Sequence, residues 1–266
     1  MLKLGWFSTA RGPASRDLLR TVWEKAKNGG IKAEFAFVFC NRERGESPET
    51  DRFLDQVKDY GIPLVCFSSR KFKPGEGHLS DAWRLEYDRE VMRRLQGFNP
   101  DLCVLAGYKL VLGPEMCTRY KMVNLHPAAP GGPAGTWQEV IWKLIETRAG
   151  ETGAMMHMVT PEMDKGPVVT YCRFSLRGKA FDPLWKAVEG SSVASLKAEQ
   201  GEELPMFKEI RRHGLAREFP LIVATVQAFA EGRVKIENGR IVDAQGHIVP
   251  GYDLSVDVDR AVAGKV

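Results

Sequence analysis

Short apolar runs alternate with amphipathic segments along the first half of the chain. Continuous apolar runs, typical of strands buried on both faces, occupy residues 2–7, 33–40, 64–68, 101–106 and 122–125. Apolar positions at helical spacing predict helices from Ser15 to Gly29, over residues 50–60, from Ser80 to 96 and near 114–120. This alternation predicts an α/β protein whose mostly parallel twisted sheet is covered by helices in a Rossmann-like arrangement.

The second half of the chain has fewer clear elements. The pattern predicts a helix over residues 136–147 and two strands, 153–159 and 168–174, around a turn-rich loop. A polar stretch over residues 177–213 precedes a helix near 217–231. Asn238 and Gly239 stand between two alternating segments, which predicts a C-terminal β-hairpin with a two-residue turn.

Length and composition indicate one globular domain over residues 1–266. The chain has 266 residues, 44% of them hydrophobic and 27% charged, and no linker long enough to separate two domains. We expect a nucleotide- or acceptor-binding half over 1–125, a catalytic half over 126–235, and a hairpin and tail over 234–266. No apolar run reaches about 18 residues, and the N-terminus resembles a strand more than a signal peptide. A cytoplasmic protein without membrane contact is therefore expected.

The cysteines and the net charge point to no special chemistry. The 5 cysteines are odd in number, lack a CxxC pair and mostly lie in apolar runs, which is typical of buried thiols in a reducing compartment. A formal net charge of +4 without a run of like charges does not indicate nucleic-acid binding. A small anionic substrate fits this charge equally well.

The first candidate for chemistry is Asn124-Leu125-His126-Pro127, at the end of a predicted strand. Ligands of parallel sheets bind beyond the carboxyl ends of the strands. Side chains two apart in a strand point to the same side, so Asn124 and His126 would project together. An amide donor beside an imidazole can stabilise a developing oxyanion and move a proton. A histidine near a strand end is also a common structural residue, and the pattern alone leaves both interpretations open.

The second candidate is Asp164, in the loop between the two later strands. Beside His126 its carboxylate could favour the imidazolium and order a water for proton transfer. The alternative is an aspartate that caps its own turn. His157 stands in an apolar strand and is interpreted as a core residue.

These segments together resemble the folate-dependent formyltransferases, and within them the phosphoribosylglycinamide formyltransferases. The likeness runs from about residue 2 to 174 and resumes over 218–235. It is carried by Tyr87-Asp88-Arg89-Glu90, by Asn99-Pro100-Asp101 through Gly107-Tyr108, by Asn124-Leu125-His126-Pro127, by 151–159, and by Asp164-Lys165-Gly166-Pro167.

The resemblance implies a role for particular residues. Asn124, His126 and Asp164 match the catalytic residues of the family. The donor, 10-formyltetrahydrofolate, is expected to contact Arg84 and two loops, which comprise Lys109, Leu110, Val111 and Leu112, and Thr160, Pro161, Glu162 and Met163. The resemblance implies no metal. An amine acceptor bearing a phosphate is expected at the first loop, through Arg11, Gly12, Ser15 and Arg16, where a helix N-terminus and arginines favour an anion.

The chain departs from the family mainly at the acceptor side. Residues 11–16 replace a short Gly-Ser-Asn element, and residues 128–138 lack the family's Ser-Leu-Leu-Pro and its histidine-bearing turn. A Glu-His pair before Phe219 is also missing. Glycinamide ribonucleotide, and with it purine biosynthesis, is therefore the default acceptor assignment.

Several alternatives remain open at this point. The acceptor could be an amino sugar, another small amine, or water, which would make the protein a formyltetrahydrofolate deformylase. A non-catalytic folate- or nucleotide-binding protein is an alternative of a different class. A methionyl-tRNA formyltransferase is disfavoured by the short C-terminal region and the small charge. A homodimer is one assembly consistent with these expectations, and the sequence leaves the oligomeric state open.

Overall fold

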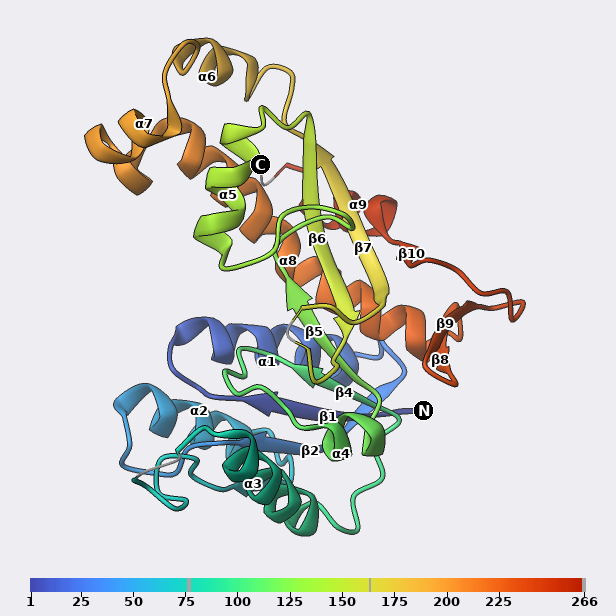
Figure 1. Ribbon diagram of the computed structural model, residues 1–266. Helices are drawn as coiled ribbons and strands as arrows, with labels where there is room; N and C mark the ends of the chain where they lie inside the picture. Colours follow the sequence, from blue (N-terminus) through green and yellow to red (C-terminus); the bar gives the residue numbers. More distant parts are fainter. Residues whose placement is uncertain (76–77, 163, 265–266) are drawn as a thin grey trace. The chain divides into compact units, whose positions relative to one another are not determined.

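The computed structural model describes residues 1–75, 78–162 and 164–264, which form two compact units. The first unit comprises Met1–Asn124, His157–Pro167 and Val226–Ile248. The second comprises Leu125–Met156, Val168–Thr225 and Val249–Val266. The chain passes between them inside β5 (Met122–His126), β6 (Glu151–Met158) and α8 (Pro205–Ala230) (Figure 1). The predicted division of one domain into halves stays a prediction.

The sheet of the first unit is parallel, with the strand order β5-β4-β1-β2-β3. Besides β5, its strands are β1 (Leu2–Ser8), β2 (Ala33–Cys40), β3 (Leu64–Cys66) and β4 (Leu102–Leu105). Gly5 is required where β1 meets its neighbours, because a Cβ there would lie 2.7 Å from both the Phe37 ring and the Cys103 sulfur. The predicted mostly parallel sheet covered by helices is confirmed.

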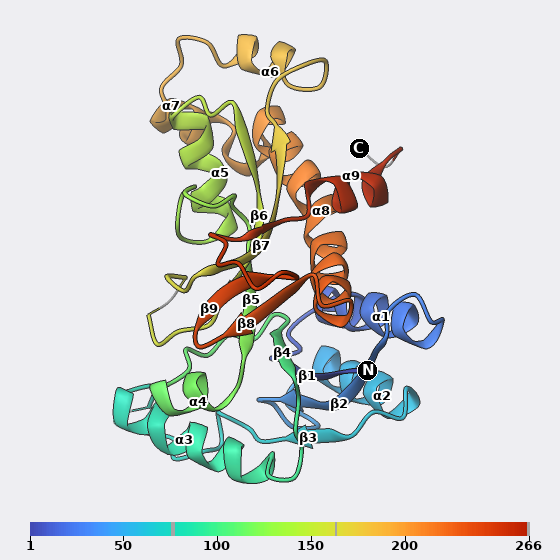
Figure 2. The same cartoon turned by 90° about the vertical axis from the view of Figure 1, so that its right-hand side faces the viewer.

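Four helices cover this sheet. They are α1 (Pro13–Lys27), α2 (Pro48–Asp59), α3 (Asp81–Arg94) and α4 (Pro114–Arg119). Trp83, Tyr87 and Val91 of α3 share one apolar cluster with Met116 of α4 and with the phenylalanines of β1 and β2. Helices α1 and α2 lie on the opposite face of the sheet (Figures 1 and 2). Each face of the sheet is therefore buried, as the continuous apolar runs predict.

The prediction that the first helix opens at Ser15 is wrong. Helix α1 begins at Pro13, with Gly12 at the N-cap in extended conformation and no side-chain cap. Proline suits this first helical position because its φ is already helical and its missing N–H would have no partner there. A serine N-cap is present at α3, where Ser80 Oγ accepts a hydrogen bond from Trp83 N–H.

The second unit combines strands β6, β7 (Val168–Ser175) and β10 (Tyr252–Asp253) with a helical layer. Its shorter elements are α5 (Trp137–Glu146), α6 (Asp182–Ala187), α7 (Val193–Glu199), the 3-10 turn η1 (Gly201–Glu203) and α9 (Ser255–Val262). Apolar side chains of α5, α6, α7 and the start of α8 form one buried cluster. The polar stretch 177–213 therefore contains helices, although its composition predicted none.

Helix α8 begins at Pro205, about twelve residues before the predicted start, and continues through Pro220. Met206, Phe207 and Ile210 are buried in the cluster of the second unit. Their packing stabilises a helix in a stretch whose polar residues and Gly214 have weak helix propensity, because burial in the tertiary structure outweighs local propensity.

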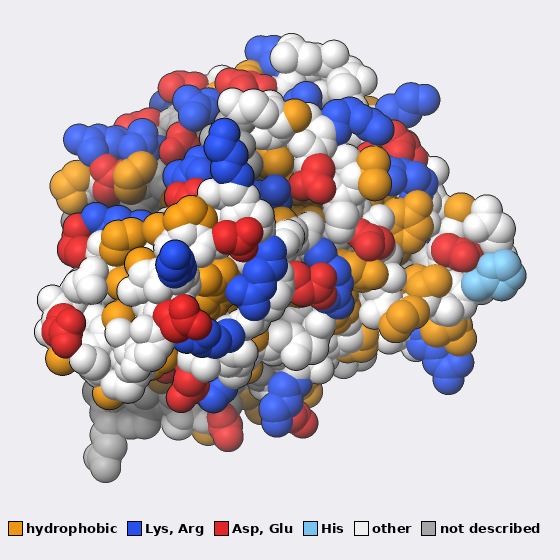
Figure 3. Space-filling model, turned by 90° about the horizontal axis from the view of Figure 1, so that it is seen from above, with side chains coloured by type: hydrophobic (Ala, Val, Ile, Leu, Met, Phe, Trp, Pro, Cys, Tyr) orange, Lys and Arg blue, Asp and Glu red, His pale blue; other side chains and the backbone are white. Residues whose placement is uncertain are grey.

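The predicted hairpin is confirmed as β8 (Val234–Glu237) paired antiparallel with β9 (Arg240–Asp243). Asn238 and Gly239 both have positive φ, 49° and 71°, as a two-residue turn of this hand requires. Among the described residues, none of the helices combines the length and apolarity needed to cross a bilayer. One face of the molecule carries interspersed basic and acidic side chains (Figure 3).

Candidate active site

Strand β5 carries two of the predicted catalytic residues. Asn124 is half-buried and pairs in register with Leu105 of β4. His126 is only 3% exposed, and its Nε2 lies 3.1 Å from the carbonyl oxygen of Pro133. A carbonyl oxygen can only accept, so Nε2 carries the proton in this contact. Pro133 belongs to residues 128–138, which lack the pattern expected from the family resemblance, so this segment contributes one contact that orients the His126 ring.

Asp164 stands in a tightly closed loop of the first unit. Met158 N–H donates to Pro167 O at 2.8 Å across the base of this loop. A Cβ on Gly166 would lie 1.8 Å from Met158 O, so only glycine fits there. Asp164 itself has a φ of 56°, in the left-handed region that few residues other than glycine, asparagine and aspartate adopt. Such strain often accompanies functional positions.

His157 is the partner of Asp164 that the sequence interpretation did not identify. It is 3% exposed, as expected of a core residue, but its Nε2 lies 3.4 Å from Asp164 Oδ1. Its Nδ1 lies 2.9 Å from Met158 O. Nδ1 therefore donates to Met158 O, while Nε2 lies beside the Asp164 carboxylate. The signal in the sequence was that His157 lies near the end of the strand that leads into the loop of Asp164.

The two predicted folate loops belong to the same unit. Lys109 is exposed, and its N–H donates to Thr9 Oγ1 at 2.9 Å. Leu112 is buried in the apolar cluster of α3 and α4, against which Leu110 and Val159 also pack. Val159 directly precedes Thr160, whose Oγ1 donates to Glu162 O at 2.9 Å. The apolar character expected of this region is present, and its use by folate stays a prediction.

The remaining predicted donor contacts differ in polarity and exposure. Arg84 lies on α3 and pairs with Asp81 at 3.0 Å, with about a third of its side chain exposed. Pro161 and Glu162 are exposed, and Glu162 pairs with Lys165 at 3.0 Å. Val111 is half-buried. Met163 lies outside the described residues.

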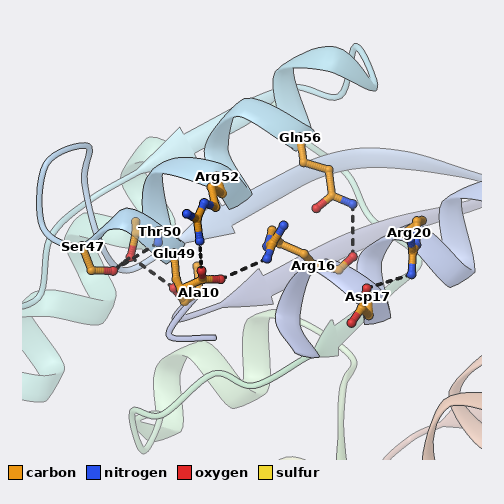
Figure 4. Close-up of polar contacts among 9 residues, drawn as sticks. All are labelled: Ala10, Arg16, Asp17, Arg20, Ser47, Glu49, Thr50, Arg52 and Gln56. Atoms are coloured by element: carbon orange, nitrogen blue, oxygen red, sulfur yellow. Dashed lines mark hydrogen bonds and ion pairs between the residues drawn. The ribbon is translucent and has the colours of Figure 1, made fainter. Parts of the chain in front are cut away.

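The first loop is divided between exposed and engaged residues. Arg11 is exposed, and a Cβ on Gly12 would meet nothing within 4 Å. Ser15 is buried, with its Oγ 3.2 Å from where a Cβ on Gly107 would stand. Arg16 reaches across from α1 to Glu49 of α2 at 3.2 Å, as Figure 4 shows. The loop after β4 is thus in contact with the first loop, while the charge of Arg16 is already paired.

No described residues form a group of three or more His, Cys, Asp or Glu suited to a metal ion. The cysteines are free thiols, of which Cys40, Cys103 and Cys172 are buried. Burial raises the pKa of the Cys172 thiol to about 11, so it stays protonated at neutral pH.

Relatives of known function share this architecture and sequence. Phosphoribosylglycinamide formyltransferase of Escherichia coli (strain K12) is 24% identical over 238 residues, which cover 88% of this chain and 92% of the relative. Formyltetrahydrofolate deformylase of Haemophilus influenzae is 32% identical over 147 residues, 53% of this chain and 44% of the relative. The solved phosphoribosylglycinamide formyltransferase of Coxiella burnetii, in complex with CHES, superposes with a TM-score of 0.63 at 19% identity, covering 95% of this chain and 98% of that one.

The structural likeness establishes the fold, and the sequence match establishes the family. Residues 13–175, more than half of the chain, match the formyl transferase family. This chain therefore belongs to the formyl transferase family, and the prediction of a folate-dependent formyltransferase is confirmed at that level.

Proposed function

We propose that the protein transfers the formyl group of 10-formyltetrahydrofolate to a primary amine that carries a phosphate, with glycinamide ribonucleotide as the first candidate. Asn124, His126 and Asp164 carry the reaction. The observation that most supports this is the family match over residues 13–175, which spans all three, with Asn124 and His126 at the carboxyl end of one parallel strand.

The reaction needs an oxyanion stabiliser and a route for one proton. The amine nitrogen attacks the formyl carbon, and the formyl oxygen gains negative charge as its double bond opens. The Asn124 amide supplies one donor for that oxygen, and His126 supplies a second through Nδ1 when its ring carries a proton on both nitrogens, because its Nε2–H donates to Pro133 O. The carbon–nitrogen bond to the folate then breaks, and the proton lost by the amine passes to the folate nitrogen. Asp164, whose Oδ1 lies 3.4 Å from Nε2 of His157, accepts and returns a proton in this exchange.

The test compares glycinamide ribonucleotide with its dephosphorylated riboside in a formyl-transfer assay. We expect kcat/KM to be at least about tenfold higher for the phosphorylated amine, because a charge-assisted phosphate contact is lost with the riboside. His126→Ala should lower kcat by about a hundredfold. His247→Ala, at an exposed position in the C-terminal hairpin region, is the matched control. Equal kcat/KM for the two amines would move the assignment to an uncharged acceptor such as an amino sugar.

Deformylation is a second candidate, favoured by the 32% identity to the Haemophilus influenzae deformylase. In that reaction water takes the place of the amine, and formate is released. Formate release from 10-formyltetrahydrofolate without any amine, at a rate matching the rate of transfer with amine, would favour this function over the first.

A further inference from the structure

Three arginines follow the carboxyl ends of three adjacent strands of the first unit, β1, β2 and β3. Ser8 of β1 pairs with Cys40 of β2, and Cys40 with Cys66 of β3, so these strands end at one level. Arg11, Arg42 and Arg70 come a few residues after them. The carboxyl edge of a parallel sheet is where α/β proteins bind ligands. Of the three, only Arg11 is expected at the acceptor site from the sequence pattern.

Hydrogen bonds hold the loops bearing these arginines together. Asn41 N–H donates to Ser8 O at 3.3 Å, and Ser69 N–H donates to Asn41 O at 3.1 Å. The Asn41 side chain also donates to Ser69 Oγ at 3.2 Å. Thr50 Oγ1 donates to Ala10 O at 3.1 Å, beside Arg11 (Figure 4). These hydrogen bonds therefore hold the backbone next to each arginine in place and connect the three loops to one another.

Arg42 lies at the floor of this arrangement. It is 6% exposed, whereas Arg11 and Arg70 are exposed at the rim. Among the described residues, no ion pair or side-chain hydrogen bond engages Arg42, and none of its guanidinium nitrogens is buried without a partner, so the group reaches solvent. A largely buried cation that no side chain of the protein neutralises is costly, and a ligand that neutralises it would offset this cost.

In the part of the chain that the structure describes, the carboxylates near Arg42 form no ion pair with it. Glu43 pairs with Lys71 at 2.9 Å, and Glu49 pairs with Arg16 at 3.2 Å. Glu46 Oε1 accepts the N–H of Glu43 at 2.9 Å, whereas its Oε2 is buried without a hydrogen-bond partner among these residues. Glu46 thus attracts Arg42 by its charge, without an ion pair between the two described side chains.

The charges around Arg42 are mostly of its own sign. Burial lowers the pKa of the Arg42 guanidinium, and the positive charges of Arg70 and Arg11 lower it further. The attraction of Glu46 is smaller than either repulsion and offsets it only in part. An anion bound among the three arginines would remove both the repulsion and the cost of burial.

We propose that Arg11, Arg42 and Arg70 bind the phosphate group of the acceptor amine, with Arg42 as the floor of the site and the other two at its rim. Guanidinium groups suit this ligand because their planar N–H forks bind phosphate oxygens in pairs. The proposal rests on the formyl transfer proposed above and names the residues that read the acceptor. It assigns the phosphate to unpaired arginines, while Arg16 is held by Glu49.

The first test measures binding of inorganic phosphate and of pyrophosphate by calorimetry, with no folate present. Arg42→Gln and Arg70→Gln should each weaken the binding by about tenfold. Arg44→Gln is the matched control, since it removes the same charge from the same loop at an exposed position. It should change the affinity by less than about twofold. Arg70 is exposed, so its variant tests the site even if Arg42→Gln folds poorly.

A second readout separates ligand binding from a structural role. Without any anion, Arg42→Gln should melt at or above the temperature of the wild type, because it removes a repelled buried charge. With pyrophosphate, the wild type should melt at the higher temperature. A variant that is destabilised equally in both buffers would assign Arg42 to the core and overturn the proposal.

The outcomes for this site and for the proposed function are distinguishable. If the wild type binds neither probe, or if Arg42→Gln and Arg70→Gln bind both like the wild type, the arginine site is refuted even when formyl transfer stands. If the wild type binds the probes at the arginines but formylates no phosphorylated amine, the proposed function is refuted and the site stands.

Discussion

Two arginines of almost equal burial have opposite surroundings in the two units. Arg42 of the first unit is 6% exposed and Arg217 of the second is 7% exposed. Arg217 pairs with Asp259 at 3.2 Å, donates to His213 O at 3.1 Å and lies 4.4 Å from the centre of the Phe174 ring. Arg42 faces two further arginines.

This difference distinguishes an arginine whose charge is neutralised within the protein from an arginine whose charge is available to a ligand. Every contact of Arg217 joins parts of the second unit, here α8 with β7 and α9, so its partner is supplied by the fold. Around Arg42 the repulsion of Arg70 and Arg11 exceeds the attraction of Glu46, which is the surrounding expected of a site for an external anion. The comparison predicts that substitution of Arg42 changes ligand binding, whereas substitution of Arg217 changes stability.

The largest effect is expected at Asp164, the strained carboxylate of the first unit. Asp164→Asn keeps the shape and the left-handed conformation but removes the negative charge beside His157. We expect kcat to fall by about a hundredfold, with little change in melting temperature. Steady-state kinetics and thermal melts check this, with the exposed Asp55→Asn as control. A variant with nearly normal kcat would remove Asp164 from the mechanism.

A new charge placed in the first unit should also act on function. Leu110 is half-buried against the cluster next to Val159, where the folate is expected. Leu110→Asp should weaken folate binding by at least about tenfold, because the apolar slot offers the carboxylate no partner. Folate titrations of this variant and of Val256→Asp, at a 72% exposed position in the second unit, give the comparison. Equal affinities would place the folate elsewhere.

Asp88 is the acidic counterpart of Arg42, a buried carboxylate that accepts a hydrogen bond from Gly113 N–H at 2.6 Å. Burial raises its pKa from 3.8 to about 6. Between these values the Asp88 carboxyl binds more protons in the folded state than in the unfolded state, so its contribution to stability should fall as the pH rises from about 4 to 6. This loss should amount to about 2 kcal/mol. Urea unfolding of the wild type and of Asp88→Asn at several pH values isolates it as the difference between the two curves. A difference that stays constant over this range would contradict the assignment.

The smallest effect is expected at Arg217 itself. Arg217→Met keeps most of the apolar stem but loses the contacts to Asp259 and to the carbonyl of His213. Because Asp259 is 55% exposed and stays solvated, the free energy of unfolding should fall by only about 1–2 kcal/mol. We expect kcat and the phosphate affinity to stay unchanged. A loss of phosphate affinity equal to that of Arg42→Gln would end the distinction between the two arginines.

Local sequence determined much of the fold. The apolar runs placed the parallel strands, Ser80 marked the start of α3, and Asn238-Gly239 marked the hairpin. These features depend on interactions within a few residues, such as strand burial, a cap or a turn with positive φ. The motif residues around Asn124 and Asp164 likewise indicated the family that the matches establish.

Only the tertiary structure decided the rest. Helix α8 begins at Pro205 because Met206, Phe207 and Ile210 are buried against α5, α6 and α7, a packing that local pattern does not reveal. The pairing of His157 with Asp164 depends on the closure of one loop. Arg11, Arg42 and Arg70 are unremarkable along the chain, where ordinary arginines are exposed or paired. They become a cluster because three parallel strands end at one edge, and the repulsion between charges depends on distance in space.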